Sequence, residues 1–410
     1  MVSQNCRFCS SNLNKIFVDL GKSPLANSYL KENDFDKEKI YPLCTFLCKN
    51  CFLVQLEELE TPENIFSEYA YFSSFSTSWL KHAKNYVDMI IPRLLLDENS
   101  LVIEIASNDG YLLQNFTDKN IDVMGIEPAQ NVAKVAIEKN IPTITKFFNS
   151  QLSRDLVNNG KTADLIIGNN VFAHVPCLND FIDGLKILLN PNGVITLEFP
   201  HLLQLMQHNQ FDTIYHEHFS YFSLLTVQKI FDNHNLKIFD VDEISTHGGS
   251  LRLYVTHKDN NQIIISKNIL SILEKEKNFG LDKISTYDKF SKHIYKINFD
   301  LQNFIKTVKN ESKSIICYGA PAKGNTLLNY CNISSDQIDY TVDKNPHKQN
   351  LFLPGTHIPI YSPEKIKETK PDYVLILPWN LKDEIMDEID YIREWGGKFV
   401  VPIPEVKILN

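Results

Sequence analysis

The chain has 410 residues, with 41 Lys or Arg against 50 Asp or Glu, which gives a net charge of −9. This length predicts two or three domains, and 43% hydrophobic with 22% charged residues is typical of a globular protein that dissolves in water. Because there is no membrane-length apolar run, no signal-peptide pattern and no basic tract, we expect a cytoplasmic enzyme that binds neither membrane nor nucleic acid.

Cysteines are concentrated at the start of the chain. Two C-x-x-C pairs, Cys6 with Cys9 and Cys48 with Cys51, flank a long intervening segment. Four thiolates can close a tetrahedral zinc site, which leaves no open coordination position and therefore serves structure rather than catalysis. Disulfide bonds are the alternative, and a reducing compartment disfavours them. Cys44 could replace Cys48, but the symmetric pairs favour Cys48 as the ligand.

A parallel α/β pattern follows the cysteine region. After an aromatic and hydroxyl-rich stretch over 69–76, the sequence predicts a helix over 79–96. Strands are predicted at 101–106, 123–126, 164–168 and 194–199, with a turn over 107–110 and a helix over 111–116 between the first two. Strands that alternate with helices indicate a parallel sheet.

The pattern changes in the second half of the chain. Apolar residues at three- and four-residue steps predict an amphipathic helix within 275–309, whose apolar face we expect to pack against the protein. A second α/β unit follows, with strands at 314–318, before Asp343, at 373–377 and at 398–401, and with a helix from Asn325. We therefore expect a zinc-binding domain over 1–75, a cofactor-binding α/β domain over 76–255, a helical connector over 256–310 and a second, Rossmann-like α/β domain over 311–410.

The turn after the first predicted strand distinguishes between cofactors. Ala106, Asn108 and Gly110 stand where a nicotinamide-binding fingerprint has three glycines. Losing two glycines hinders the approach of a pyrophosphate, whereas S-adenosylmethionine has none. Glu127 ends the next strand, where it can accept hydrogen bonds from both ribose hydroxyls. A solvated loop carboxylate is the alternative for Glu127.

The turn of the second α/β unit also lacks a nicotinamide fingerprint. Pro321 occupies the middle glycine position. Gly319, Lys323 and Gly324 could approach a phosphate, with Lys323 as a point charge. A helix start that carries a surface lysine is an equal alternative.

Four proton-handling side chains follow one another at 215–218. They are Tyr215, His216, Glu217 and His218. If this segment is extended, Tyr215 and Glu217 face one way and the two histidines the other. The segment is compatible with a metal site, with a structural tyrosine–histidine cluster, or with acid–base catalysis.

The ordered set of motifs is similar to that of the nucleotide-sugar C-methyltransferases of the sugar 3-C-methyltransferase type. The resemblance spans nearly the whole chain and rests on the four cysteines and on the segments EIASNDGYLL from Glu104, NNVFAHV from Asn169, YHEHFSYFS from Tyr215, HGGSLR from His247, YGAPAKGNTLLNY from Tyr318, LPGTHIPI from Leu353 and LILPWN from Leu375. It implies an α/β fold with a small zinc-binding N-terminal domain, a central class I methyltransferase Rossmann-like domain and a C-terminal second Rossmann-like domain. Ala106 departs from the glycine expected in the family.

The resemblance also implies a reaction and its residues. Family members methylate a ring carbon of a nucleotide-linked 4-keto-6-deoxyhexose, using S-adenosylmethionine and a structural zinc. The implied catalytic residues are His218 as the base, Glu217 as an orienting group, Tyr215 or Tyr69 as the donor to the enolate oxygen, and His174. The implied cofactor contacts are Glu104, Ala106, Ser107, Asn108, Asp109, Gly110, Glu127 and Asn169. The implied substrate contacts are Tyr71, His247, Arg252, Lys323 and Asn325, and the implied zinc ligands are Cys6, Cys9, Cys48 and Cys51.

Other functions remain possible from the residues alone. An O-methyltransferase acting on the same sugars needs the same cofactor and a similar base, but no ketone. A nicotinamide-dependent sugar oxidoreductase explains the two α/β units but leaves the zinc unused, and a zinc-ribbon nucleic-acid protein conflicts with the negative charge. A monomer or a small homo-oligomer is expected, and the nucleotide base and the methylated carbon (3 or 5) are left open.

Overall fold

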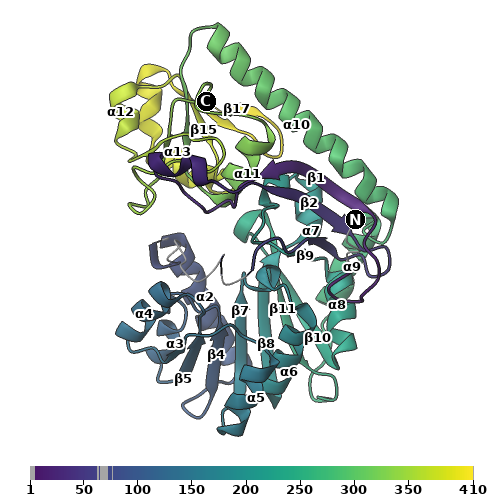
Figure 1. Ribbon diagram of the computed structural model, residues 1–410. Helices are drawn as coiled ribbons and strands as arrows, with labels where there is room; N and C mark the ends of the chain where they lie inside the picture. The colour runs from purple at the N-terminus through teal and green to yellow at the C-terminus, as the bar shows by residue number, and fades with distance from the viewer. Residues whose placement is uncertain (1–4, 62–63, 65–72, 76, 410) are drawn as a thin grey trace. The chain divides into compact units, whose positions relative to one another are not determined.

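The computed structural model describes residues 5–61, 64, 73–75 and 77–409, and these residues form two compact units (Figure 1). Unit 1 contains residues 1–13, 48–201 and 219–282, and unit 2 contains residues 14–47, 202–218 and 283–410. The chain therefore enters each unit more than once. The domain boundaries expected at 75, 255 and 310 stay predictions.

Unit 1 is built on a seven-stranded sheet with the order β10-β11-β8-β7-β4-β5-β6. The strands are β4 Leu101–Ile105, β5 Asp122–Ile126, β6 Thr143–Ile144, β7 Ala163–Asn169, β8 Leu189–Pro200, β10 Leu236–Ile244 and β11 Ser250–His257. The five strands from β4 to β8 are parallel, and four of them, β4, β5, β7 and β8, were predicted from their apolar runs, whereas β6 was not. In contrast, β11 is antiparallel to both β8 and β10. The antiparallel hairpin was not predicted.

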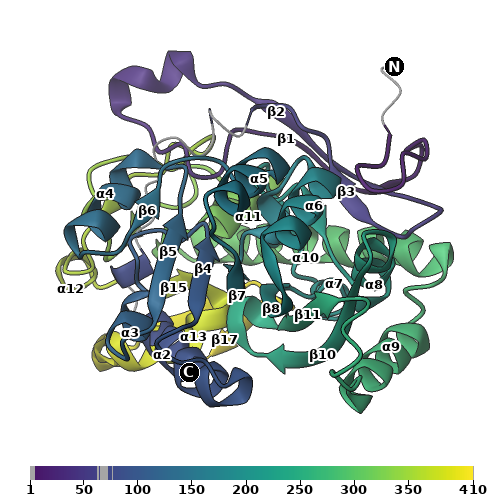
Figure 2. The same ribbon diagram turned by 90° about the horizontal axis from the view of Figure 1, so that it is seen from below.

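Helices cover both faces of this sheet. One face packs against α2 Thr77–Leu94, α3 Gln114–Thr117 and α4 Gln130–Glu138. The other face packs against α5 Ser150–Asn158, α6 Leu178–Leu188, α8 Leu224–Asn233 and α9 Lys267–Phe279. Figure 2 shows α2 and α3 on one side of the strands, with α5 and α6 on the other. The helix expected over 111–116 is shorter than predicted, because residues 111–113 form a turn.

The cysteine pairs of unit 1 lie outside this sheet, next to a short antiparallel ladder. The ladder joins β3 Val54–Leu56 to β9 Ser220–Tyr221. Three of the four cysteines belong to the apolar core that also contains α6 and α8. The zinc-binding segment is therefore packed against the helices of the central fold.

Unit 2 combines a hairpin, a long helix and a second sheet. The hairpin is β1 Ile16–Ser23 with β2 Tyr41–Leu47. The sheet has the order β14-β13-β12-β15-β16-β17, and all its pairs are parallel except β16 with β17. The strands of this sheet are β12 Ile315–Tyr318, β13 Thr341–Val342, β14 Ile360–Tyr361, β15 Tyr373–Ile376, β16 Lys398–Val401 and β17 Lys407–Leu409. The helices of unit 2 are α7 Leu202–Gln207, α10 Ile284–Asn310, α11 Ala322–Tyr330, α12 Lys365–Thr369 and α13 Lys382–Glu388.

The long helix confirms the packing predicted from its apolar spacing. The six apolar positions of that pattern are buried: Phe290, Ile294, Ile297, Leu301, Ile305 and Val308. The helix begins at Ile284 rather than near 275, because the preceding helix α9 ends at Gly280, whose left-handed φ of 94° suits glycine. None of the helices in the described ranges is both long and apolar enough to cross a bilayer. The predicted α/β fold class is confirmed.

Candidate functional site

The four predicted cysteine ligands come together in unit 1. Their sulfur atoms all lie within 4.8 Å of one another, with Cys6 and Cys51 3.6 Å apart and Cys9 and Cys48 3.5 Å apart. A tetrahedral zinc site with Zn–S bonds of about 2.3 Å has sulfur–sulfur edges of about 3.8 Å. The cluster therefore fits a zinc ion with little adjustment, and Cys44 is not part of it.

Polar contacts hold this cluster from outside. The Gln55 amide donates to the Cys6 sulfur at 3.2 Å, which is the kind of contact that orients a thiolate ligand. The Thr226 hydroxyl of α8 donates to the backbone carbonyl of Cys51 at 3.2 Å. The zinc-binding segment is thus fastened to the central fold by hydrogen bonds as well as by apolar packing.

The turn after β4 keeps the backbone shape of a glycine-rich turn without its glycines. Ala106, Asn108 and Gly110 all have left-handed φ angles, of 56°, 49° and 75°. Asparagine tolerates this region, whereas alanine is strained in it. A side chain on Gly110 would also meet Ile141, since a Cβ at this position would lie 2.3 Å from the Ile141 Cδ1 atom. The departure at Ala106 therefore leaves the shape of the turn intact.

Glu127 braces this turn from the end of β5. Its Oε2 accepts a hydrogen bond from the Asn108 backbone N–H at 2.9 Å, and its Oε1 accepts one from Ala129 N–H at 2.9 Å. Each carboxylate oxygen retains a further lone pair for a ligand hydroxyl. The alternative of a solvated loop carboxylate is wrong, because Glu127 is buried.

The side chains of the turn also hold the segment before α2. Asn108 Oδ1 accepts a hydrogen bond from the Ser73 backbone N–H at 3.0 Å, and Asp109 Oδ2 accepts one from Ser74 N–H at 3.3 Å. Lys139 lies 3.8 Å from the same Asp109 carboxylate. The turn is therefore fixed on several sides before any ligand binds.

Several buried polar atoms at the carboxyl ends of β4 and β7 have no partner within the described residues. They are Glu104 Oε2, Ser107 Oγ, Asp109 Oδ1, and Oδ1 and Nδ2 of Asn169. Buried polar atoms are almost always paired in native proteins, so this group fits a polar ligand. Burial and the neighbouring carboxylates of Glu127 and Asp109 raise the pKa of Glu104 well above its usual range. A ligand with a cationic group would offset that repulsion.

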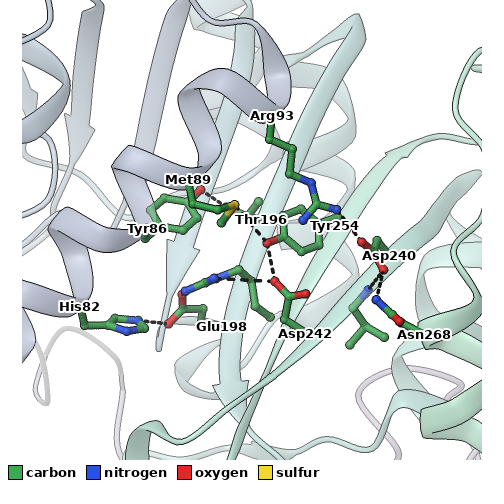
Figure 3. Close-up of polar contacts among 12 residues, drawn as sticks. His82, Tyr86, Met89, Arg93, Thr196, Glu198, Asp240, Asp242, Tyr254 and Asn268 are labelled. Atoms are coloured by element: carbon green, nitrogen blue, oxygen red, sulfur yellow. Dashed lines mark hydrogen bonds and ion pairs between the residues drawn. The ribbon is translucent and has the colours of Figure 1, made fainter.

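Arg252, predicted as a substrate contact, is already engaged in an ion-pair network with Glu198. Figure 3 shows Glu198 with His82 beside it. Its Nε and a terminal nitrogen lie 2.7 Å and 2.5 Å from Glu198 Oε1, and His82 Nε2 lies 2.9 Å from Glu198 Oε2. Burial alone would raise the pKa of Glu198, but the His82 hydrogen bond and the Arg252 charge hold it below its usual range. The network ties α2 to β8 and β11.

Two histidines predicted as site residues lie in unit 1, in segments that connect strands of its sheet. His174 is in a short 3₁₀ helix, Phe172–His174, that follows β7. His247 is in the turn between β10 and β11, with its ring 5.4 Å from that of Trp79. Tyr69 and Tyr71 lie outside the described residues.

The segment with four proton-handling residues lies in unit 2 and forms a tight turn. The His218 N–H donates to the Tyr215 carbonyl at 2.9 Å. The alternation expected of an extended segment is therefore wrong, because a turn brings its first and fourth residues to the same side. The Tyr215 hydroxyl consequently lies 2.8 Å from His218 Nε2.

Hydrogen bonding defines which nitrogen of His218 is basic. Its Nδ1 lies 2.9 Å from the carbonyl oxygen of Thr213. A carbonyl oxygen only accepts, so Nδ1 carries the proton and Nε2 of the neutral ring has the lone pair. The Tyr215 hydroxyl therefore donates to Nε2. This arrangement is a base paired with a hydroxyl donor.

The metal-binding alternative for this segment has no geometric support. His216 Nε2 lies 3.0 Å from the Pro42 carbonyl, which makes this nitrogen a donor rather than a metal ligand. Over the described ranges, the only cluster of metal-ligating side chains is that of the four cysteines.

Glu217 is the buried carboxylate of the turn. The Nδ2 of Asn27, a residue that sequence reasoning missed, donates to Glu217 Oε1 at 2.6 Å. Burial raises the pKa of Glu217 to about 7, against the opposing effects of the Asn27 hydrogen bond and the Lys348 charge. Asn27 carried no signal in the sequence, since it lies 190 positions from Glu217 and belongs to no motif.

Lys323 and Asn325, predicted as substrate contacts, lie at the start of α11 in the same unit. The Lys323 amine packs over the Trp379 ring at 4.4 Å, and the Trp379 indole donates to Asp212 Oδ2 at 2.6 Å. Burial lowers the pKa of Lys323 to about 8, with Asp212 opposing the shift. Asn325 donates to the backbone carbonyl of Ala26 at 2.6 Å. Asn325 thus holds the segment that carries Asn27, the residue bonded to Glu217.

The glycines of the second turn are explained by packing within the protein. A Cβ on Gly319 would lie 2.5 Å from Pro378 Cγ, and one on Gly324 would lie 2.9 Å from Leu377 Cβ. Asp343 directly follows β13, where a dinucleotide fold places its ribose-binding acid. It instead accepts a hydrogen bond from the Ala320 N–H at 2.7 Å. This turn is therefore poorly suited to a dinucleotide.

Comparison with known proteins gives matches over nearly the whole chain. Three family models match in order: a zinc-binding domain at residues 6–66, a methyltransferase domain at 79–241 and a C-methyltransferase C-terminal domain at 245–404. The chain is 34% identical to the C-methyltransferase NovU of Streptomyces niveus over 406 residues, which are 99% of this chain and 96% of that protein.

Solved structures match a smaller part of the chain. One is a magnesium protoporphyrin IX methyltransferase from Synechocystis with bound SAM, at 17% identity, 42% of this chain, 79% of that chain and a TM-score of 0.32. Another is an S-adenosylmethionine-dependent methyltransferase from Clostridium acetobutylicum, at 13% identity, 43% of this chain, 92% of that chain and a TM-score of 0.35.

Proposed function

Because this chain belongs to the C-methyltransferase family, we propose that it methylates a ring carbon, carbon 3, of a nucleotide-linked 4-keto-6-deoxyhexose. The protein is an S-adenosylmethionine-dependent C-methyltransferase with a zinc-binding domain. The single observation that carries the sugar proposal is the Tyr215–His218 pair, in which a fixed tautomer presents a basic nitrogen beside a hydroxyl. Its predicted setting is a cytoplasmic monomer or small homo-oligomer.

The chemistry of carbon methylation requires such a pair. A sugar carbon becomes nucleophilic only when a ketone on the neighbouring carbon allows its proton to be removed, which leaves an enolate. In this proposal the bound sugar displaces the Tyr215 hydroxyl from His218 Nε2, which then takes that proton. A tyrosine hydroxyl, from Tyr215 or Tyr69, donates to the oxygen on which charge develops. Glu217 orients a neighbouring group, and His174 helps to position the sugar.

The buried polar atoms of unit 1 that have no partner among the described residues support the proposed cofactor site. Glu104, Asn108, Glu127 and Asn169 would hold S-adenosylmethionine, which supplies an electrophilic methyl group and carries the cationic groups that a buried Glu104 favours. The turn itself contributes Ala106, Ser107, Asp109 and Gly110. Four thiolates leave zinc no open position, so the metal takes no part in this chemistry.

The substrate contacts have unequal support. Lys323 and Asn325 share unit 2 with the Tyr215–His218 pair, which favours them as contacts for the nucleotide sugar. His247 and Tyr71 rest on the family resemblance alone. Arg252 would have to share its guanidinium with Glu198.

Two alternative reactions can be compared with the geometry. The second turn is filled by packing and by the Asp343 hydrogen bond, which disfavours a nicotinamide-dependent oxidoreductase. An O-methyltransferase remains the closest rival, because it also uses a base beside its acceptor.

Incubation with labelled S-adenosylmethionine and a set of 4-keto nucleotide sugars tests the proposed reaction. We expect label in the sugar with a ketone-bearing substrate, and none once the ketone has been reduced, because the carbon then has no removable proton. Label on a hydroxyl oxygen, or transfer that survives reduction, would refute the C-methylation of such a sugar.

Replacing Glu127 with alanine should weaken cofactor binding by roughly 2–4 kcal/mol, more than tenfold in Kd. The change removes the ribose contacts and also the acceptor that braces the Asn108 N–H of the turn. Calorimetry with S-adenosylmethionine measures the effect, and Glu138→Ala, an exposed position on α4, is the matched control. An unchanged Kd for Glu127→Ala would remove this residue from the cofactor site.

A further inference from the structure

We propose that Asn27 is a positioning residue of the active site, which holds one oxygen of Glu217 so that the other stays free for a donor group of the sugar. The inference deepens the proposed function and rests on it. It concerns a residue of the N-terminal segment, far in sequence from the turn that carries the base.

The contacts around Glu217 divide its two oxygens. Oε1 accepts the Asn27 Nδ2–H at 2.6 Å, whereas Oε2 is buried and has no partner among the residues that the structure describes. An acceptor left unpaired in a buried site costs free energy unless a ligand supplies the donor. A hydroxyl or ammonium group of the substrate would supply it. Asn27 determines which oxygen remains available.

The charged and titratable groups near Glu217 come from several elements. The positive charge of Lys348, in the loop after β13, favours the ionised form of Glu217. Tyr29 also lies near Glu217, and its hydroxyl donates to the Ala320 carbonyl at 2.5 Å. His216 and His218 flank it in the turn, with the Nε2 of His216 and both nitrogens of His218 bonded to other groups. Asp343 lies 3.9 Å from Lys348 and partly offsets its charge. Asn27 is thus the only hydrogen-bond donor to Glu217 in the described part of unit 2.

The backbone at Asn27 is held independently of its side chain. Asn325 donates to the carbonyl of Ala26, the preceding residue, at 2.6 Å, and Leu30 pairs with Phe352 through backbone hydrogen bonds. Removing the Asn27 amide therefore leaves the segment in place. A loss of function in Asn27→Ala would report on Glu217 rather than on folding.

The direction of the expected pH effect follows from the hydrogen bond. An N–H donor favours the ionised carboxylate, so its removal raises the pKa of Glu217, which lies at about 7 in the intact protein. If the ionised form accepts the substrate's donor, the rising limb of the pH–rate profile moves up by about one to two pH units. Turnover at pH 7 then falls by about 5- to 50-fold and recovers as the pH is raised.

The experiment compares Asn27→Ala and Asn27→Asp with Asn303→Ala, an exposed position on α10. Asn27→Asp keeps the shape but places a second carboxylate beside Glu217, so it should shift the profile at least as far as alanine. In parallel, the Glu217 carboxyl is titrated by NMR in protein carrying ¹³C-labelled glutamate. Its signal is identified as the one missing from Glu217→Gln, and this readout needs no turnover.

The outcomes separate the inference from the function on which it rests. We expect the Glu217 midpoint and the pH–rate limb to rise together in both Asn27 variants and to stay unchanged in Asn303→Ala. An unchanged midpoint in Asn27→Ala overturns the inference, even in an enzyme that methylates its sugar normally. A raised midpoint in a protein that methylates no keto sugar supports the Asn27–Glu217 link and counts against the proposed reaction.

Discussion

Replacing His218 with asparagine is expected to lower methyl transfer by roughly 100-fold or more. Asparagine has a similar shape and can still donate to the Thr213 carbonyl, but it has no nitrogen that accepts a proton at the strength of Nε2. Turnover with a 4-keto nucleotide sugar measures the loss. His216→Asn is the matched control, because its ring nitrogen is bonded to the Pro42 carbonyl and has no role in the proposal.

Proton exchange gives a sharper test of the same assignment. If His218 removes the proton next to the ketone, wild-type protein with substrate and a non-transferring cofactor analogue in heavy water should place deuterium on the carbon to be methylated. His218→Asn should abolish this exchange, and Tyr215→Phe, which loses one donor, should slow it to a comparable or smaller extent without changing cofactor affinity. Normal turnover in His218→Asn would show that another group is the base.

Loss of zinc should have the largest effect on stability. Binding to a four-thiolate site contributes about 10–16 kcal/mol in small zinc modules, as much as the whole stability of a typical domain. We expect Cys6→Ser, or prolonged chelation, to unfold the N-terminal segment and to release the packing of the cysteines against α6 and α8. Metal analysis should give close to one zinc per chain in the wild type, and thermal melting should show the destabilisation.

Cys44→Ser provides the control for the zinc prediction. Cys44 lies in β2 and outside the four-sulfur cluster, so this variant should keep its zinc and its melting temperature close to those of the wild type. Soluble, active protein without metal would contradict the structural role, and loss of zinc in Cys44→Ser would contradict the ligand set.

Features that depend on local spacing could be predicted from the sequence. The two C-x-x-C pairs identify the zinc cluster because the four ligands occur in two short runs, and the apolar runs identify the parallel strands because both faces of such a sheet are buried. The apolar face of α10 follows from its helical period in the same way. Each of these patterns consists of short runs or regular spacings that can be recognised along the chain without knowing the fold.

Features that depend on distant pairing could not be predicted. The turn at 215–218 has the expected residues, but its shape depends on contacts that the segment makes with Thr213 and with other parts of unit 2. Arg252 pairs with Glu198 because β11 lies antiparallel to β8 in the register that places these two residues opposite each other. That register belongs to a hairpin whose existence was itself missed.

The repeated entry of the chain into each unit has a consequence for engineering new substrate specificity. A chimera of two family members made with one junction near residue 283 would exchange only the last of the three segments of unit 2. The segment with Asn27 and the segment with Glu217 would still come from the other parent. The α11 helix, whose Asn325 holds Ala26 beside Asn27, would then come from a different protein than the segments it contacts. Recombination that keeps residues 14–47, 202–218 and 283–410 from one parent is therefore the design that preserves this unit.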